Sequence, residues 1–126
     1  MSGPNVVDSS GWLEYLIGSE RSELFAAAIE DADNLIVPVI SIYEVFKKVL
    51  RDRGEADALQ IASAMQTGRV IDLDLSLLLE AARHKLPLAD SIIYATAQRF
   101  EATLWTQDEH FESFPDVQYF AKSNQA

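Results

Sequence analysis

The chain of 126 residues has a mass of 14.0 kDa, which suffices for one compact domain and is too small for two ordinary ones. It contains no cysteine, which excludes disulfide scaffolds, zinc–thiolate sites and thiol nucleophiles. Twenty acidic residues against ten Lys and Arg give a formal net charge of −10, which argues against an ordinary basic nucleic-acid binder, while a hydrophobic content of 48% excludes disorder.

Short apolar runs alternate along the chain with longer segments of helical period, as in α/β domains with a mainly parallel sheet. We expect Gly18 and Gly68 to end the helices before them. Residues 1–120 are predicted to form a single domain and 121–126 a polar C-terminal tail. In chain order, the pattern predicts a strand at 5–7, helices near 11–17 and 20–32, a strand at 35–38, a helix at 41–53 and another after Gly54, a strand at 69–71, helices at 77–85 and 88–100, and strands at 103–105 and 117–120.

The sequence carries no signal for a membrane or for export, so we expect a cytoplasmic protein. Its longest apolar stretches, 35–40 and 75–79, are far shorter than the roughly 20 residues of a spanning helix. The first residues lack the basic segment and apolar core of a secretory signal.

Two acids follow predicted strands. Asp8 comes directly after the first strand, and Asp108 lies three residues after Trp105, the end of the fourth. Ligands of open α/β sheets bind outside the carboxyl ends of the strands, where the strand order reverses. If the order is 3-2-1-4-5, the first and fourth strands are neighbours at that point, and Asp8 and Asp108 face each other.

Two further acids lie in the first turns of predicted helices. Asp90 opens an otherwise apolar helix that Pro87 introduces, and Glu44 follows Ser41 by three residues. Purely structural roles are open to these acids as well. Ser41 and Glu44 fit a capping box, and Asp8 fits the N-cap of the first helix.

Taken together, the four acids and their surroundings resemble the PIN-domain nucleases, and in particular the VapC-type toxins of bacterial toxin–antitoxin pairs. The resemblance covers nearly the whole chain, and its most specific segment is Leu-Pro-Leu-Ala-Asp with the following Ala-Thr-Ala. The segments that carry it are Val7-Asp8-Ser9-Ser10, Ile42-Tyr43-Glu44-Val45, residues 86–97 and Leu104-Trp105-Thr106-Gln107-Asp108 with Phe111.

The resemblance implies a three-layer α/β/α fold with a mainly parallel five-stranded sheet in the order 3-2-1-4-5. It implies that Asp8, Glu44, Asp90 and Asp108 form the catalytic, metal-binding pocket of an endoribonuclease that leaves a 5′-phosphate and a 3′-hydroxyl. Clustered carboxylates repel one another unless a cation neutralises them, and all-oxygen ligation suits Mg²⁺, or Mn²⁺. The resemblance also implies a cognate antitoxin as partner and a toxin homodimer.

Neighbouring residues extend this hypothesis. Ser9 and Thr106 are candidates to hold a ligating acid or a metal-bound water. His110 stands where many family members carry a further acid, and Lys85 where glycine is common. His110 is a candidate to contact a phosphate or a metal-bound water, and the number of ions, one or two, stays open.

Basic residues cluster just beyond Glu44. Lys47, Lys48 and Arg51 share one helical face with Glu44, so an RNA backbone passing over the acid would meet them. The alternative is a solvated face with a Glu44–Lys48 pair worth a few tenths of a kcal/mol.

Other functions remain as alternatives. A phospho-acceptor receiver domain would use Asp72 after the third strand and Lys122, but it leaves Glu44 and Asp90 without a role. Asp72 and Asp74 are spaced like the Asp-x-Asp motif of haloacid-dehalogenase-type phosphatases, but the residues that follow do not complete that motif. Asp74 fits better as the start of a helix. Metal-free cleavage of RNA would need both histidines, His84 and His110. A further alternative is a catalytically inactive PIN fold that only binds partners.

Overall fold

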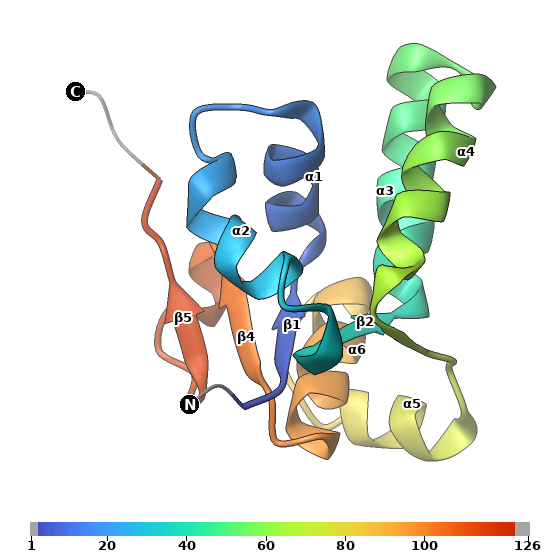
Figure 1. Cartoon of the computed structure of the whole chain (residues 1–126). Coiled ribbons are helices and arrows are strands. Elements are labelled where there is room, and N and C mark those ends of the chain that lie inside the picture. The colour runs from blue at the N-terminus through green and yellow to red at the C-terminus, as the bar shows by residue number, and fades with distance from the viewer. Residues whose placement is uncertain (1–2, 123–126) are drawn as a thin grey trace.

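The computed structural model describes residues 3–122 and shows one five-stranded sheet at the centre of the molecule (Figure 1). All neighbouring strands are parallel, in the order β3-β2-β1-β4-β5. The predicted strand order is therefore confirmed. The strands are β1 (Asn5–Val7), β2 (Leu35–Pro38), β3 (Arg69–Ile71), β4 (Thr103–Thr106) and β5 (Val117–Tyr119).

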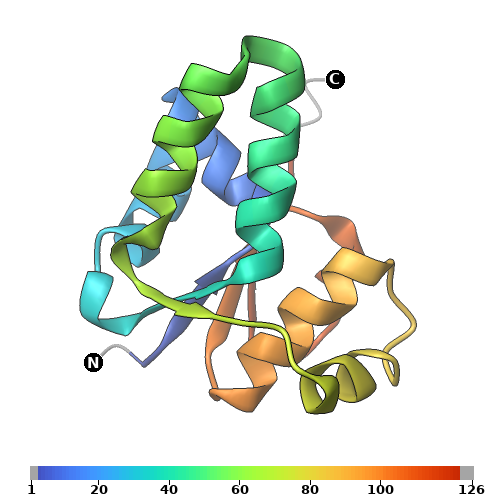
Figure 2. The same cartoon turned by 90° about the vertical axis from the view of Figure 1, so that its right-hand side faces the viewer.

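Helices cover both faces of this sheet, which confirms the three-layer α/β/α architecture. Figure 2 shows α6 on the opposite side of the sheet from α2, with α3 and α4 side by side as an antiparallel pair. Helix α5 packs along α6. The helices are α1 (Ser9–Ile17), α2 (Ser22–Ile29), α3 (Val39–Arg53), α4 (Glu55–Ala64), α5 (Leu75–Ala81) and α6 (Leu88–Arg99). Short 3₁₀ turns lie at Ala32–Asn34, Met65–Thr67 and Glu109–Phe111.

The central strand β1 is buried on both of its faces. Val7 packs in the cluster formed with α1 and α2, whereas Val6 packs in the cluster formed with α6. Successive side chains of a strand point to opposite faces, so a continuous apolar run is what a covered parallel strand requires. Asp8 follows this buried central strand directly and therefore lies at the carboxyl-terminal ends of the strands.

The first helix begins two residues earlier than predicted. The Asp8 side chain accepts a hydrogen bond from the Gly11 backbone N–H at 3.1 Å and so acts as the N-cap. Gly11 also permits close packing, because a Cβ there would lie 2.7 Å from the Phe25 ring. Gly18 ends α1 in the left-handed conformation, with φ of 71°, as predicted.

Other predicted helix boundaries also differ from the structure; the helix predicted at 77–85, for example, is α5 (Leu75–Ala81). Helix α3 begins at Val39, after Pro38, so Ser41 lies inside the helix, fully buried, and forms no capping box with Glu44. Gly68 has φ of −97° and is no left-handed stop. It is required instead by close approach, since a Cβ there would lie 2.5 Å from the Leu35 carbonyl oxygen.

The topology also argues against the receiver hypothesis. Receiver-type sheets have the order 2-1-3-4-5, which places the third strand beside the first. Here β3 is an edge strand, separated from β1 by β2, so Asp72 follows a strand remote from Asp8. Asp74 caps α5 by accepting from the Leu77 N–H at 2.7 Å, as expected.

No helix within residues 3–122 is long and apolar enough to cross a membrane. Residues 123–126 of the predicted polar tail lie outside the described residues.

Candidate metal-binding active site

All four predicted acids line one hollow at the carboxyl-terminal edge of the sheet. Its volume is about 300 Å³, and Ser9, Ser10, Leu13 and Lys48 complete its lining. The acids are brought there by different elements: Asp8 follows β1, Glu44 lies on α3, Asp90 lies in the first turn of α6, and Asp108 follows β4. Residues 100 positions apart in sequence are thereby gathered around one cavity.

Asp8 is the buried member of the set, with only 4% of its surface exposed. Burial raises the pKa of its carboxyl group to about 6, against hydrogen bonds from Thr106, Gly11 and Ser10, which lower it. Asp90 raises the pKa slightly further by charge repulsion. Asp8 is thus held in place by three donors.

Thr106 joins the two strands at the point where the strand order reverses. Its hydroxyl donates to Asp8 Oδ2, and its oxygen accepts from the Asp108 backbone N–H at 2.9 Å. The side chain is fully buried. One residue therefore contacts the Asp8 carboxylate and the Asp108 backbone at the same time.

Ser9 does the same for the third acid. Its hydroxyl donates to Glu44 Oε1 at 2.6 Å and ties α1 to α3 across 35 positions of sequence. This hydrogen bond restricts the orientation of the Glu44 carboxylate and leaves its second oxygen without a contact to Ser9.

Asp90, Asp108 and His110 form the most compact group around the hollow. His110 Nδ1 lies 3.1 Å from Asp90 Oδ2 and 3.2 Å from Asp108 Oδ1. The Asp90 contact and the neighbouring Asp108 charge raise the pKa of His110. Burial, followed by the Asp108 and Glu44 charges, raises the pKa of Asp90, although the His110 hydrogen bond opposes this.

These residues fit a divalent cation. One ligand atom from each of Asp90, Asp108 and His110 lies within 4.8 Å of the others, and the imidazole lies between the two carboxylates. Oxygen-rich sites of this kind suit Mg²⁺ or Mn²⁺. Burial is the main cause of the raised pKa values of Asp8 and Asp90, and the charges of neighbouring acids add to it; a bound cation would favour the ionised carboxylates.

The basic residues of α3 behave differently from one another. The predicted Glu44–Lys48 pair does not form, because Lys48 lies 3.2 Å from Asp52 and Glu44 accepts from Ser9. Arg51 contacts the same Asp52 at 3.1 Å, and Lys47 lies over the Tyr43 ring. Lys48 is the one of the three that also lines the hollow.

The sequence did not point to a second group of polar residues behind Asp108. Gln107 is 3% exposed; it accepts from Arg21 Nε at 2.6 Å and donates to Glu14 at 2.9 Å. Arg21 also donates to the backbone oxygens of Phe120 and Ala121. In the sequence, only the position of Gln107 beside Asp108 could have drawn attention to this group, because its partners Arg21 and Glu14 are distant in sequence.

The fold agrees with the comparison to known families. The family model of the PIN domain matches residues 6–117. The chain belongs to the PIN-domain family. No curated protein gives a significant match to the whole sequence.

Several solved structures share the PIN fold with this chain. A toxin–antitoxin complex from Klebsiella pneumoniae matches at 22% identity with a TM-score of 0.73, covering 90% of this chain and 95% of that one. VapBC2 from Rickettsia felis, bound to a DNA fragment of its promoter, matches at 11% identity and 0.71, over 93% and 98% of the two chains. Mycobacterium tuberculosis VapC20, a toxin that cleaves the sarcin–ricin loop, matches at 14% identity and 0.71, over 88% and 95%. The PIN domain thus spans nearly the whole chain.

Proposed function

We propose that this PIN domain is a Mg²⁺-dependent endoribonuclease, with Mn²⁺ as a possible substitute, and the toxin of a type II toxin–antitoxin pair. The observation that carries the proposal is the convergence of Asp8, Glu44, Asp90 and Asp108 on one hollow, with Asp8 buried and anchored by Thr106. An isolated structural cap needs no such convergence. The expected products carry a 5′-phosphate and a 3′-hydroxyl.

The acids would hold the ion, while their partners keep the acids in place. When bound, a divalent ion supplies positive charge that activates water and stabilises the phosphate oxygens. Thr106 and Gly11 favour the ionised form of Asp8, Ser9 directs Glu44, and His110 Nδ1 contacts the carboxylates of both Asp90 and Asp108. Near neutral pH, Asp8 is then mostly a carboxylate, because its pKa of about 6 lies below that pH.

Lys48 is the best placed of the basic candidates to attract the RNA. Although it also contacts Asp52, it lines the hollow beside Glu44, and neither Lys47 nor Arg51 does so. A net charge of −10 gives little general attraction for RNA, so local cations and bound metal must supply it.

The proposed partners are a cognate antitoxin and a second copy of the toxin. The similar structures from Rickettsia felis and Klebsiella pneumoniae are of toxin–antitoxin complexes. An acidic hollow is complementary to a basic segment of an antitoxin, such as an Arg reaching into it. We propose that the complex is cytoplasmic.

Cleavage of structured RNA by the purified chain in Mg²⁺ tests the activity. Asp90→Asn removes one acid without changing its size, and Asp72→Asn makes the same charge change on an exposed residue outside the hollow. We expect at least a hundredfold loss of cleavage rate for Asp90→Asn, as is usual for residues that position metal or stabilise developing charge, and none for Asp72→Asn. Equal rates for the two variants would refute the proposed nuclease site.

A further inference from the structure

A second hollow lies beside the acidic one, on the β5 side of Asp108. Its volume is about 440 Å³, and it shares Ser10 and Asp108 with the first. Gln107, Glu109, Tyr119, Ala121 and Lys122 complete its lining. Pockets of roughly 300–1,000 Å³ are the usual size for small organic ligands. The two hollows therefore adjoin at Ser10 and Asp108.

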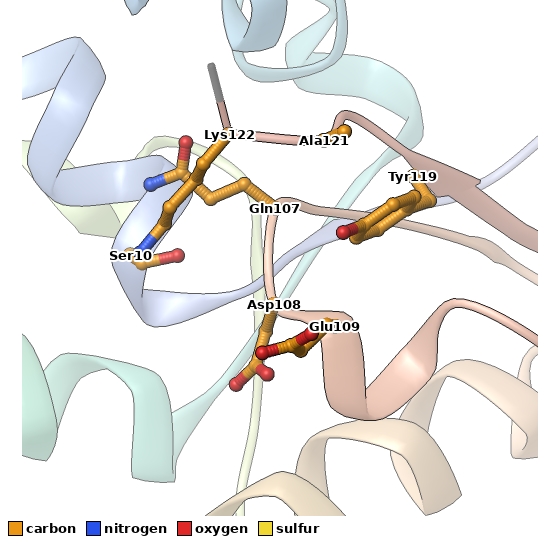
Figure 3. A pocket seen from close by; sticks show the side chains of 7 residues that line it. All are labelled: Ser10, Gln107, Asp108, Glu109, Tyr119, Ala121 and Lys122. Carbon is orange, nitrogen blue, oxygen red and sulfur yellow. The ribbon is translucent and has the colours of Figure 1, made fainter. Parts of the chain in front are cut away.

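The lining of this second hollow is suited to a nucleotide. Figure 3 shows the Lys122 side chain extending toward Ser10, and the Tyr119 hydroxyl pointing into the space between them and Asp108. An ammonium and a hydroxyl are donors for phosphate oxygens, and an aromatic ring is a platform for a base. Asp108 and Glu109 lie together at the other side, toward the metal-binding group.

A lysine lies on each side of the four acids. Lys48 lines the first hollow beside Glu44, and Lys122 lines the second hollow, which also contains Glu109. One or two divalent ions would bring the four carboxylates from −4 to −2 or 0, so the positive charges that attract an RNA strand to the two hollows are those of Lys48 and Lys122. These ammonium groups are donors for phosphates on either side of one that lies at the acids.

The wall of the second hollow is built into the fold. Arg21 binds the side chain of Gln107 and the backbone oxygens of Phe120 and Ala121, next to Lys122. Phe120 in turn packs edge-on against the Phe25 ring at 5.4 Å. The chain that carries Tyr119 and Lys122 is therefore held beside Asp108 before any ligand binds.

We propose that this hollow is the subsite for the RNA nucleotide that flanks the scissile phosphate. Lys122 and Ser10 contact the adjacent phosphate, and the Tyr119 ring stacks on the base. This assignment rests on the proposed nuclease function, but its test measures RNA binding and does not require cleavage.

The test measures binding of a fluorescein-labelled single-stranded oligoribonucleotide by fluorescence anisotropy at several salt concentrations. Every protein compared carries the Asp90→Asn substitution, so that the RNA is not cleaved during the measurement. We expect Lys122→Gln to weaken binding about three- to tenfold and to lower the salt slope of log K by about 0.7, the value for one phosphate contact on a single strand. Arg53→Gln is the matched control, because it removes one positive charge at the far end of α3. Equal salt slopes for Lys122→Gln and Arg53→Gln would overturn the subsite.

Tyr119 gives a second measurement on the same samples. Tyr119→Leu is expected to weaken binding about fivefold or more, whereas Tyr119→Phe keeps the ring and the affinity. Equal affinity of all three proteins contradicts the stacking role. Cleavage by the wild-type chain is assayed separately in Mg²⁺. If the wild type cleaves RNA but Lys122→Gln binds RNA as tightly as its parent, the subsite is refuted and the nuclease function is not. If the wild type does not cleave RNA, the proposed function is refuted, and the binding comparison still tests the subsite.

Discussion

The Thr106 hydroxyl donates a hydrogen bond to the carboxylate of Asp8 and accepts one from the Asp108 backbone N–H. A single buried side chain thus connects the end of β1 with the segment that follows β4. These strands are neighbours only because the sheet order reverses at β1. The relationship gives Asp8 both its position and part of its acidity.

Replacing Thr106 by Val should therefore impair the site without removing any acid. The pKa of Asp8 rises when the Thr106 donor is lost, so the acidic limb of the pH–rate profile moves to higher pH. We expect about a tenfold lower rate at neutral pH and limiting Mg²⁺. Thr106→Ser, which keeps the hydroxyl, should retain the wild-type profile. A Thr106→Val profile identical to wild type would contradict this role.

Asp8 should also make the stability of the metal-free protein depend on pH. Its pKa is about 6 in the folded chain and 3.8 in the ordinary reference state, so the folded protein binds the proton more tightly. The tighter binding of this proton adds about 3 kcal/mol to the free energy of unfolding at low pH, and this stabilisation is lost as the pH rises through 6.

Urea unfolding in EDTA, across the range from pH 4 to pH 7, measures this contribution. The free energy of unfolding of the wild type should fall relative to that of Asp8→Asn as the pH rises. Asn keeps an oxygen for the Gly11 N–H, so the N-cap is preserved. A constant difference between the two proteins over this range would contradict the raised pKa.

Binding of Mg²⁺ should stabilise the folded chain through the compact acidic group. A ligand present at 100 times its Kd adds about 2.7 kcal/mol, or several degrees in Tm. Thermal unfolding with and without Mg²⁺ should show this rise for the wild type and for Asp72→Asn, and lose it in Asp108→Asn. The same rise in Asp108→Asn would place the ion elsewhere.

Arg21 should be needed for the order of the β5 edge. Its guanidinium reaches Gln107 and two backbone oxygens at once, which a lysine ammonium cannot reproduce in the same geometry. Arg21→Lys should destabilise the protein by about 1–3 kcal/mol, the cost of leaving such donors and acceptors unpaired. Hydrogen exchange should quicken at the Phe120 N–H, which is bonded to Thr106 O. Unchanged exchange there would show that Arg21 does not hold this edge.

Much of the fold could be predicted from the sequence, because five apolar runs bounded by helical segments admit few parallel topologies. The meeting of Asp8 and Asp108 followed from their positions after strands, and the structure bears out that placement. The capping box at Ser41 was wrong because a local four-residue pattern does not reveal that the helix already begins after Pro38. Contacts such as Arg21 with Gln107 join residues 86 positions apart and depend on packing that no local pattern encodes.

The most direct test of the central claim is the chemistry of the RNA ends produced by the wild-type chain. Metal-activated water attacking the phosphate leaves a 5′-phosphate and a 3′-hydroxyl, whereas acid–base catalysis by histidines alone would use the 2′-hydroxyl and leave a cyclic phosphate. We predict cleavage in Mg²⁺ with 5′-phosphate products and no cleavage in EDTA. Cleavage that persists in EDTA, or products ending in a 2′,3′-cyclic phosphate, would contradict a metal-dependent PIN nuclease.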